Sequence, residues 1–160
     1  MAEKEKMTIV VFSGDLDKVY AAFIIATTAA SMGKEVSMYF TFWGLNVLRK
    51  KRFLFGAPKF LQKMFSVMNR GGAERLPLSK FHLGGIGTFF MKLLMKQYKM
   101  PRISEMIKLA KQLNVKMIPC TTTIGVMGLK KEDFIPEAGE IAGASTYLSL
   151  ASEGKVNLFI

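Results

Sequence analysis

A strand pattern, a helix pattern and a second strand pattern follow one another within the first 40 residues. Residues 8–12 form a β-branched, apolar run that ends in the turn sequence 13–15. Residues 16–30 repeat apolar side chains at a spacing near 3.6, Gly33 follows them, and residues 35–40 form another short apolar run. A strand, helix and strand joined this closely form a right-handed βαβ unit with parallel strands. The carboxyl ends of both strands should therefore reach the same edge of a sheet.

The same alternation resumes toward the carboxyl terminus. An amphipathic helix is predicted over residues 103–113, and a short buried strand over residues 115–119 follows it. Two more helices are predicted, one that begins at residue 121 and one over residues 145–152, and residues 156–160 form a last apolar strand. Strands that alternate with helices favour an α/β fold, an open parallel sheet of four to five strands with helices on both faces.

Length and composition favour a single domain over residues 1–160. A chain of 160 residues, half of them hydrophobic, is long enough for one well-buried core and short for two. Its positive charge is concentrated, because residues 46–102 contain 13 Lys and Arg against one acidic residue, whereas the rest of the chain contains ten against eleven. We therefore interpret the chain as a neutral domain with a basic insertion at about 46–102.

The insertion has two clusters of apolar side chains interrupted by lysines, over residues 53–68 and 89–95, with a glycine-rich loop after Asn69 between them. Neither cluster reaches the roughly 20 apolar residues of a membrane span, so we predict a pair of basic amphipathic helices. Such helices can cover the sheet edge as a lid, build a homo-oligomer, lie on an anionic membrane surface or dock an acidic protein. Nucleic acid is disfavoured, because the basic residues alternate with Met and Leu rather than with exposed aromatic side chains.

Cysteine and histidine content narrows the chemistry. Cys120 is the one cysteine and His82 the one histidine, so the chain has no intrachain disulfide and offers no zinc cluster or histidine-based triad. We expect neither a metal nor a cofactor, and a cytoplasmic location. The first six residues are charged and of mixed sign, unlike a secretory signal, and we interpret His82 as a surface or loop residue.

Cys120 lies where the predicted strand over residues 115–119 runs into a helix. The free N–H groups and the positive dipole end of that helix favour a thiolate over a thiol. Thr121, Thr122 and Thr123 follow directly, and their N–H groups are candidates to stabilise the anion. The alternative is that Cys120 is an inert, buried small hydrophobic residue.

Two other segments reach the same predicted edge as the cysteine. Gly14 and Asp15 lie in the turn after the first strand, where Gly14 supplies the turn conformation and Asp15 or Asp17 is placed to cap the next helix. Phe42 and Trp43 follow the second strand. A tryptophan flanked by phenylalanines in a loop is costly to expose. We therefore predict that Trp43 covers a pocket over the cysteine, packs against a neighbouring subunit, or does both.

Four segments together resemble the DsrE/DsrF-like sulfur-relay superfamily, in its DsrE-like branch that is also labelled peroxiredoxin-like. They are residues 13–18, residues 40–45, residues 76–80, and Cys120 with the sequence Val126-Met127-Gly128. The resemblance implies a flavodoxin-like, three-layer α/β/α fold, a homo-oligomer, and a cysteine, matched by Cys120, that carries sulfur as a persulfide between partner proteins. Members often have Met-Ser and an acidic residue after the cysteine, where this chain has Thr122, Thr123 and Gly125.

The residues and the resemblance together predict a sulfurtransferase of the carrier type, with Cys120 relaying sulfur from a donor protein to an acceptor protein. Hydroxyl groups of Thr121 or Thr123 would bond the terminal sulfur, and Phe42 with Trp43 would limit access of water. Since the chain has one cysteine, peroxide reduction would need an outside thiol. The alternative is a noncatalytic, oligomeric binding module, whose basic, Met-rich insertion docks an acidic partner, a membrane surface or a small anionic ligand.

Overall fold

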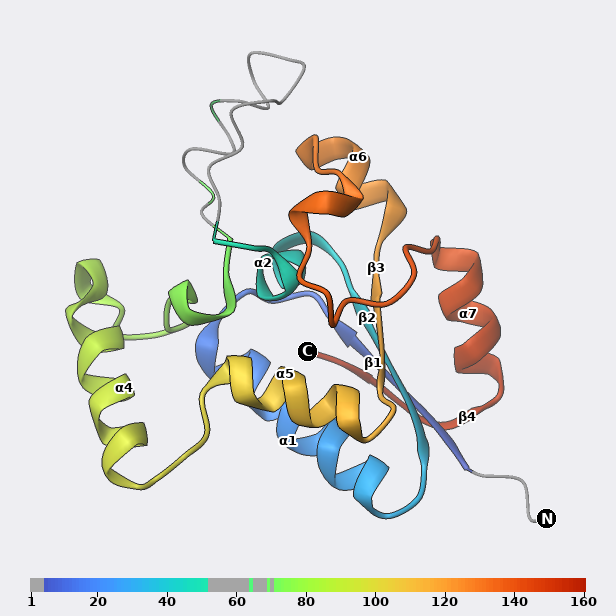
Figure 1. Ribbon diagram of the computed structural model, residues 1–160, viewed down its shortest axis with the longest axis horizontal. Helices are drawn as coiled ribbons and strands as arrows, with labels where there is room; N and C mark the ends of the chain where they lie inside the picture. The colour runs from blue at the N-terminus through green and yellow to red at the C-terminus, as the bar shows by residue number, and fades with distance from the viewer. Residues whose placement is uncertain (1–4, 52–63, 65–68, 70) are drawn as a thin grey trace.

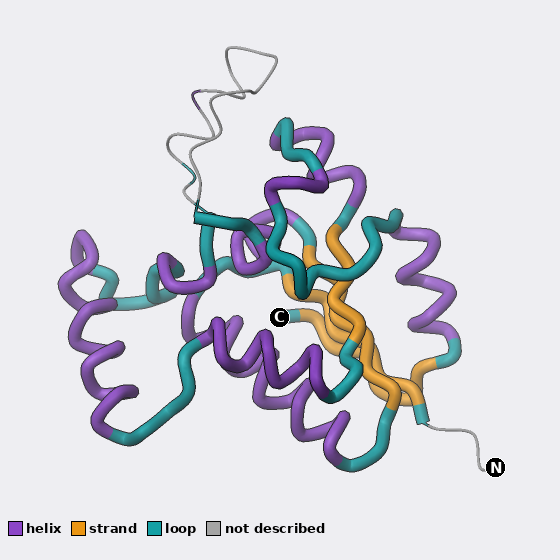
Figure 2. The backbone as a smooth tube through the Cα atoms, viewed as in Figure 1, coloured by secondary structure: helices purple, strands orange, loops and turns teal. Residues whose placement is uncertain are grey.

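The computed structural model describes residues 5–51, 64, 69 and 71–160 (Figure 1). Four parallel strands form a sheet in the order β3-β2-β1-β4. The strands are β1 (Lys6–Val11), β2 (Glu35–Phe40), β3 (Lys116–Pro119) and β4 (Gly154–Phe159). Figure 2 shows these strands side by side at the centre of the molecule, with helices on either side. The predicted α/β fold with an open parallel sheet is therefore confirmed.

The helices cover the two faces unequally. One face carries α1 (Leu16–Ser31) and α5 (Ile103–Gln112), and the other carries α7 (Ala144–Ser152), as Figure 1 shows. Two short helices, α2 (Leu45–Leu48) and α6 (Thr121–Met127), lie beyond the carboxyl ends of the strands. Single turns of 3-10 helix connect the elements at Phe42–Gly44, Ala73–Arg75, Leu83–Gly85 and Lys131–Asp133. The carboxyl edge of the sheet is thus built mainly from short segments.

Alternation along the strands divides the core between the two faces. Ile9 and Phe40 belong to the large apolar cluster that includes the side chains of α1 and α5. Tyr39 and Ile118 belong to a smaller cluster, which Tyr147 of α7 covers. Because successive side chains of a strand point to opposite faces, Tyr39 faces α7 while its neighbour Phe40 faces α1. Near the end of β2, the side chain of Tyr39 therefore lies on the face of the sheet that α7 covers.

Turn and capping residues set the helix boundaries. Gly33 follows α1 at a φ of 85°, a conformation that favours glycine, as the sequence predicts. The side chain of Asp15 does not cap α1, although Asp15 holds the N-cap position. Its carboxylate instead accepts a hydrogen bond from Ser13 Oγ at 2.9 Å and pairs with Lys18 at 2.8 Å. The predicted capping role of Asp17 is also wrong, because its carboxylate accepts the Ser79 N–H at 3.0 Å.

Within the region of the predicted insertion, α4 (Ile86–Gln97) stands apart from the sheet in Figure 1. This helix contains the predicted apolar cluster 89–95, whereas the other predicted helix, over residues 53–68, lies outside the described residues apart from Met64. His82 is exposed before α4, with Nδ1 2.8 Å from Thr88 Oγ1, which confirms it as a surface residue. In the part of the chain that the structure describes, no helix is long and apolar enough to cross a bilayer.

Candidate functional site

Cys120 lies between β3 and α6, at the N-cap position of the helix. Backbone bonds on both sides fix it in place: its N–H donates to the carbonyl of Phe40 at 2.9 Å, and the N–H of Thr121 donates to the carbonyl of Ala142 at 3.0 Å. The residue is 5% exposed and packs with Tyr39 and Ile118 on the α7 side of the sheet. The cysteine is therefore held rigidly, near the surface but almost covered.

Two threonine hydroxyl groups lie beside the sulfur. Thr123, on the first turn of α6, is 3% exposed, and its Oγ1 lies 3.0 Å from the Oγ1 of Thr41, which follows β2. The N–H of Phe42 also donates to Thr123 Oγ1, at 3.3 Å. This acceptor role leaves the hydroxyl protons of Thr41 and Thr123 for each other and for the sulfur, so the pair can donate to an anion at Cys120.

The hydroxyl of Tyr39 is the third polar group at the cysteine. It is buried and makes no well-aligned hydrogen bond to a described residue. The ring of Tyr39 stacks on Tyr147 with centroids 5.1 Å apart, which holds it in place. A thiol is a weak acceptor, so a hydroxyl beside it gains little until the thiolate forms. Burial, and then the cysteine, raise the pKa of Tyr39, so its hydroxyl stays protonated and able to donate.

These donors decide the ionisation of Cys120. Burial by itself raises the pKa of a thiol, because it removes water from the charged form. Donor groups near the sulfur, namely the Tyr39 hydroxyl, the backbone and side chain of Thr123 and the Thr41 hydroxyl, outweigh that effect because they can bond the thiolate once it forms, and they lower the pKa from 9.0 to about 7. A lowered pKa favours the thiolate, which is the nucleophilic form of a cysteine.

Of the three threonines that follow the cysteine, the structure brings Thr123 to the sulfur. Thr121 and Thr122 have exposed side chains, and the N–H of Thr121 is already bonded to Ala142. The arrangement can stabilise an anion at Cys120 from the inside of the protein, and the side chains of Thr121 and Thr122 do not take part in it.

A hollow of about 390 Å³ lies at the same edge of the sheet as Cys120, but Cys120 does not line it. Gly14, Asp15 and Trp43 are among its lining residues. A Cβ on Gly14 would lie 2.7 Å from the carbonyl oxygen of Trp43, so this close approach requires glycine. The structure thus brings three of the predicted supporting residues together, and it places them beside the cysteine site rather than in it.

Phe42 lies between the cysteine site and this hollow. Its N–H donates to Thr123 Oγ1 next to the cysteine, and its ring centroid lies 5.3 Å from that of Phe12, which lines the hollow. The Phe42 side chain is half exposed and Trp43 is 42% exposed. The turn after β2 therefore separates the buried sulfur from the open hollow.

Sequence analysis did not identify Tyr39 and Thr41 as site residues. Tyr39 is the last but one residue of β2, and Thr41 follows the strand. The sequence feature that could have identified Tyr39 is this position, which turns its side chain to the same face of the sheet as Cys120. Finding it requires knowledge that β2 and β3 are neighbours, with Tyr39 paired to Ile118. Among the described residues, no cluster of three or more His, Cys, Asp and Glu side chains is placed to hold a metal ion.

The fold and the site define a class: a parallel α/β protein with a cysteine of lowered pKa at the carboxyl edge of its sheet. The chain belongs to the DsrE/DsrF/DrsH-like family, whose sequence pattern matches residues 3–159. The resemblance noted from its motifs is therefore confirmed.

Two relatives match almost the whole chain. The chain is 40% identical over 158 residues to the uncharacterized protein YrkE of Bacillus subtilis (strain 168), covering 99% of this chain and 98% of that protein. It is 35% identical over 161 residues to the sulfur carrier protein DsrE2 of Allochromatium vinosum, covering 99% of each. The similarity thus includes the edge that carries Cys120.

Solved structures support the fold. The protein MTH1491 of Methanobacterium thermoautotrophicum aligns with a TM-score of 0.55 at 10% identity, covering 98% of this chain and all of that one. The ychN protein of E. coli aligns with a TM-score of 0.56 at 12% identity, covering 98% and 99%. At these identities the likeness concerns the architecture alone.

Proposed function

We propose that this protein is a sulfur carrier, which holds sulfane sulfur as a persulfide on Cys120 and passes it between partner proteins. The observation that carries the proposal is the set of hydroxyl donors, Tyr39, Thr41 and Thr123, around a cysteine whose pKa they lower to about 7. Family membership and the similarity to a protein named as a sulfur carrier support the same role.

The chemistry is a pair of thiolate displacements. The Cys120 thiolate attacks the outer sulfur of a donor persulfide, a new sulfur–sulfur bond forms on Cys120, and the donor's own sulfur–sulfur bond breaks as its thiolate leaves. An acceptor thiolate then attacks the outer sulfur on Cys120 and releases the Cys120 thiolate. Each step exchanges one sulfur–sulfur bond for another, so no outside oxidant, reductant or cofactor is required.

The hydroxyl donors serve both steps. They stabilise Cys120 as the attacking group in the first step and as the leaving group in the second, since a thiolate of lower pKa leaves faster. Thr121 and Thr122, which are exposed on the first turn of α6, are placed to meet the outer sulfur and the partner.

Access to the sulfur must come from the outer surface of the edge. Because Cys120 is 5% exposed, a donor or acceptor has to bind closely there before its sulfur can reach. Phe42 and Val126 are exposed apolar side chains of the two segments that adjoin the cysteine, at 50% and 70%. We propose that they form the docking surface for partner proteins in the cytoplasm.

Sulfur loading tests the proposal. The protein is treated with glutathione persulfide, and the intact mass and the peptide that contains Cys120 are measured. The wild type should gain the mass of one sulfur atom on that peptide, and Cys120→Ser should gain none. Circular dichroism of Cys120→Ser supplies the folding control. Equal sulfur uptake by the folded variant, or a wild type that takes up no sulfur, would contradict the proposal.

A noncatalytic binding module is the second candidate, and the exposed apolar side chains of α4 favour it. Phe90 and Leu94 of this helix are 58% and 48% exposed. Such a helix fits an interface between copies of the chain or a peripheral contact with an anionic membrane. If α4 builds a homo-oligomer, Leu94→Asp should lower the mass measured by sedimentation to that of a monomer, whereas an unchanged mass would exclude this interface.

A further inference from the structure

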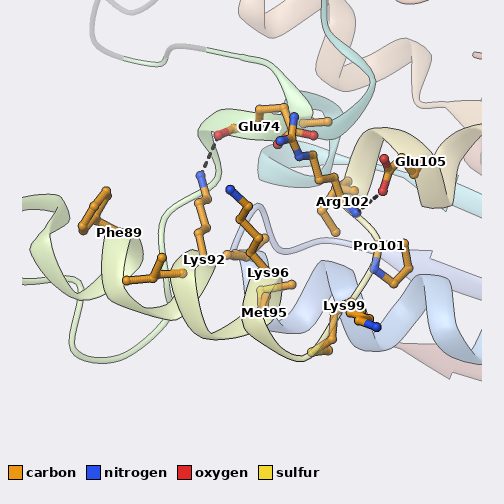
Figure 3. Close-up of a pocket in the computed structure, with 14 residues that line it drawn as sticks. Glu74, Phe89, Lys92, Met95, Lys96, Lys99, Pro101, Arg102 and Glu105 are labelled. Carbon is orange, nitrogen blue, oxygen red and sulfur yellow. Dashed lines mark hydrogen bonds between the residues drawn. The ribbon is translucent and has the colours of Figure 1, made fainter.

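A groove of about 700 Å³ lies between α4, the turn Ala73–Arg75 and the start of α5, away from Cys120 (Figure 3). Its apolar part is lined by Phe89 and Leu93 of α4 and by Met100 after that helix. These three side chains are 65%, 52% and 39% exposed, so the groove is open and uncovered. Its volume lies within the range of sites for small organic ligands.

The polar part of the groove is basic. Four cationic side chains line it, namely Lys92, Lys96, Lys99 and Arg102. Figure 3 shows the side chains of Lys92 and Lys96 extending from α4 toward the turn that holds Glu74. Two of the four cations, Lys92 and Lys96, thus point across the groove, whereas Lys99 extends away from that turn.

The two acidic residues of the groove are already bonded elsewhere. Glu74 Oε1 accepts hydrogen bonds from Ser104, from its N–H at 3.3 Å and from its Oγ at 2.7 Å. The Glu105 carboxylate accepts the backbone N–H of Arg102 at 2.7 Å. Neither acid lies within ion-pair distance of a groove lysine in the described part of the chain. The groove therefore has a surplus of positive charge.

Lys92 is the most buried of these four cations. Its ammonium group donates to the backbone carbonyl of Glu74 at 2.6 Å, which is a neutral acceptor. Burial, and the nearby charge of Lys51, lower the pKa of Lys92, while Glu74 opposes them. An anion in the groove would stabilise this ammonium group further, because it would add negative charge to that of Glu74.

We propose that the groove binds an amphiphilic anion, a long-chain fatty acid whose carboxylate meets Lys96 and Arg102 and whose chain covers Phe89, Leu93 and Met100. The apolar and basic parts of one groove match the two ends of such a ligand. Covering exposed apolar side chains supplies affinity, and the cations select the anionic head group. The site is independent of the sulfur chemistry at Cys120.

Binding of cis-parinaric acid, a fluorescent fatty acid, to the full chain tests the apolar part. The titration is run below the concentration at which the probe aggregates and should saturate. Phe89→Ala should weaken binding about tenfold, since Phe89 lines the groove. Ile86→Ala is the control, because Ile86 is similarly exposed on the same helix but does not line the groove, and it should leave the affinity unchanged.

Charge is tested in the same titration. Lys96→Glu should weaken binding about tenfold, whereas Lys108→Glu, the same charge change on the exposed side of α5, should have no effect. Oleate should displace the probe and oleyl alcohol should not. Absence of saturable binding, equal losses in each variant and its control, or displacement by the alcohol would overturn the proposal.

Vesicles of phosphatidylglycerol distinguish a fatty acid site from a membrane surface. Co-sedimentation that Phe89→Ala and Ile86→Ala weaken equally, together with no saturable binding of the probe, would assign α4 to a membrane surface and contradict a groove for a single fatty acid. Probe binding that only the groove variants lose, with or without vesicle binding, supports the proposal.

Discussion

The surroundings of Cys120 and the helix α4 differ in how far their side chains are buried. Around Cys120 the chain buries the sulfur together with the hydroxyl groups of Tyr39 and Thr123. In α4 the chain exposes phenylalanine, leucine and methionine side chains, and Thr88 is the one buried residue of the helix. At Cys120 the hydrogen-bond donors lower the pKa of the thiol against the effect of burial, whereas the exposed side chains of α4 keep their apolar area accessible.

The difference has a thermodynamic consequence. Residues of the sheet core contribute to folding, because their transfer from water is complete. Residues of α4 remain in contact with water after folding, so their apolar area contributes little to stability and is available to a ligand or partner. The sheet core therefore contributes most of the stability of the fold, whereas the exposed face of α4 contributes little.

The largest expected effect is on the free energy of unfolding, which should depend on the sheet core and not on α4. Phe23→Ala should lower the free energy of unfolding by about 3–5 kcal/mol, because Phe23 is fully buried and packs on Phe40 with ring centroids 6.2 Å apart. Phe90→Ala should change it by less than about 0.5 kcal/mol. Urea denaturation followed by circular dichroism measures both. Similar losses in the two variants would mean that α4 is part of the folding core.

The next effect concerns the buried hydroxyl beside the sulfur. Tyr39→Phe removes one donor and leaves the burial, so the pKa of Cys120 should rise from about 7 by about one pH unit. Tyr147→Phe is the control, since its Oη lies near Thr8 Oγ1, at 3.4 Å, rather than at the cysteine. The rate of iodoacetamide alkylation against pH measures both variants. An unchanged profile for Tyr39→Phe would remove Tyr39 from the site.

A smaller shift of the same kind is expected at α6. Thr123→Val keeps the backbone N–H and removes the hydroxyl, so the pKa of Cys120 should rise by about half a pH unit. Thr122→Val makes the same chemical change at an exposed position and should have no effect on the alkylation profile. Equal shifts in the two variants would mean that the helix, and not the Thr123 hydroxyl, controls the sulfur.

The last effect is on stability against pH. A thiol whose pKa is lowered to about 7 in the folded protein stabilises the fold fully above the unfolded-state value, and this contribution is lost as the pH falls through 7. Unfolding free energies of the wild type and Cys120→Ser should therefore run parallel below pH 7 and diverge above it, with the wild type gaining. Parallel curves up to pH 9 would contradict a depressed pKa in the folded state.

Local patterns explain why the sequence predicts most of the fold. The β-branched run before Ser13 and the apolar run before Cys120 have the length and turn residues of buried strands, and the helices between them keep a clear period. A cysteine directly after such a strand must lie at the carboxyl edge of a parallel sheet. That inference needs no knowledge of which strands are neighbours.

The groups that contact Cys120 cannot be predicted without knowing which strands are neighbours. Tyr39 reaches the sulfur because β2 pairs with β3 and because its side of the sheet is covered by α7, and neither fact is written in local spacing. The same holds for Trp43, which lies beside Gly14 in a separate hollow although both segments end at the same edge. Sequence periodicity identifies the edge, and long-range packing decides which groups meet there.

The pH dependence of Cys120 alkylation in the wild-type protein tests the central claim most directly, because it reports whether the buried hydroxyl groups hold this cysteine as a thiolate. The account predicts an inflection near pH 7. An inflection at or above about 8.5, the ordinary value for a cysteine, would show that burial prevails over the donors and would contradict an activated sulfur site.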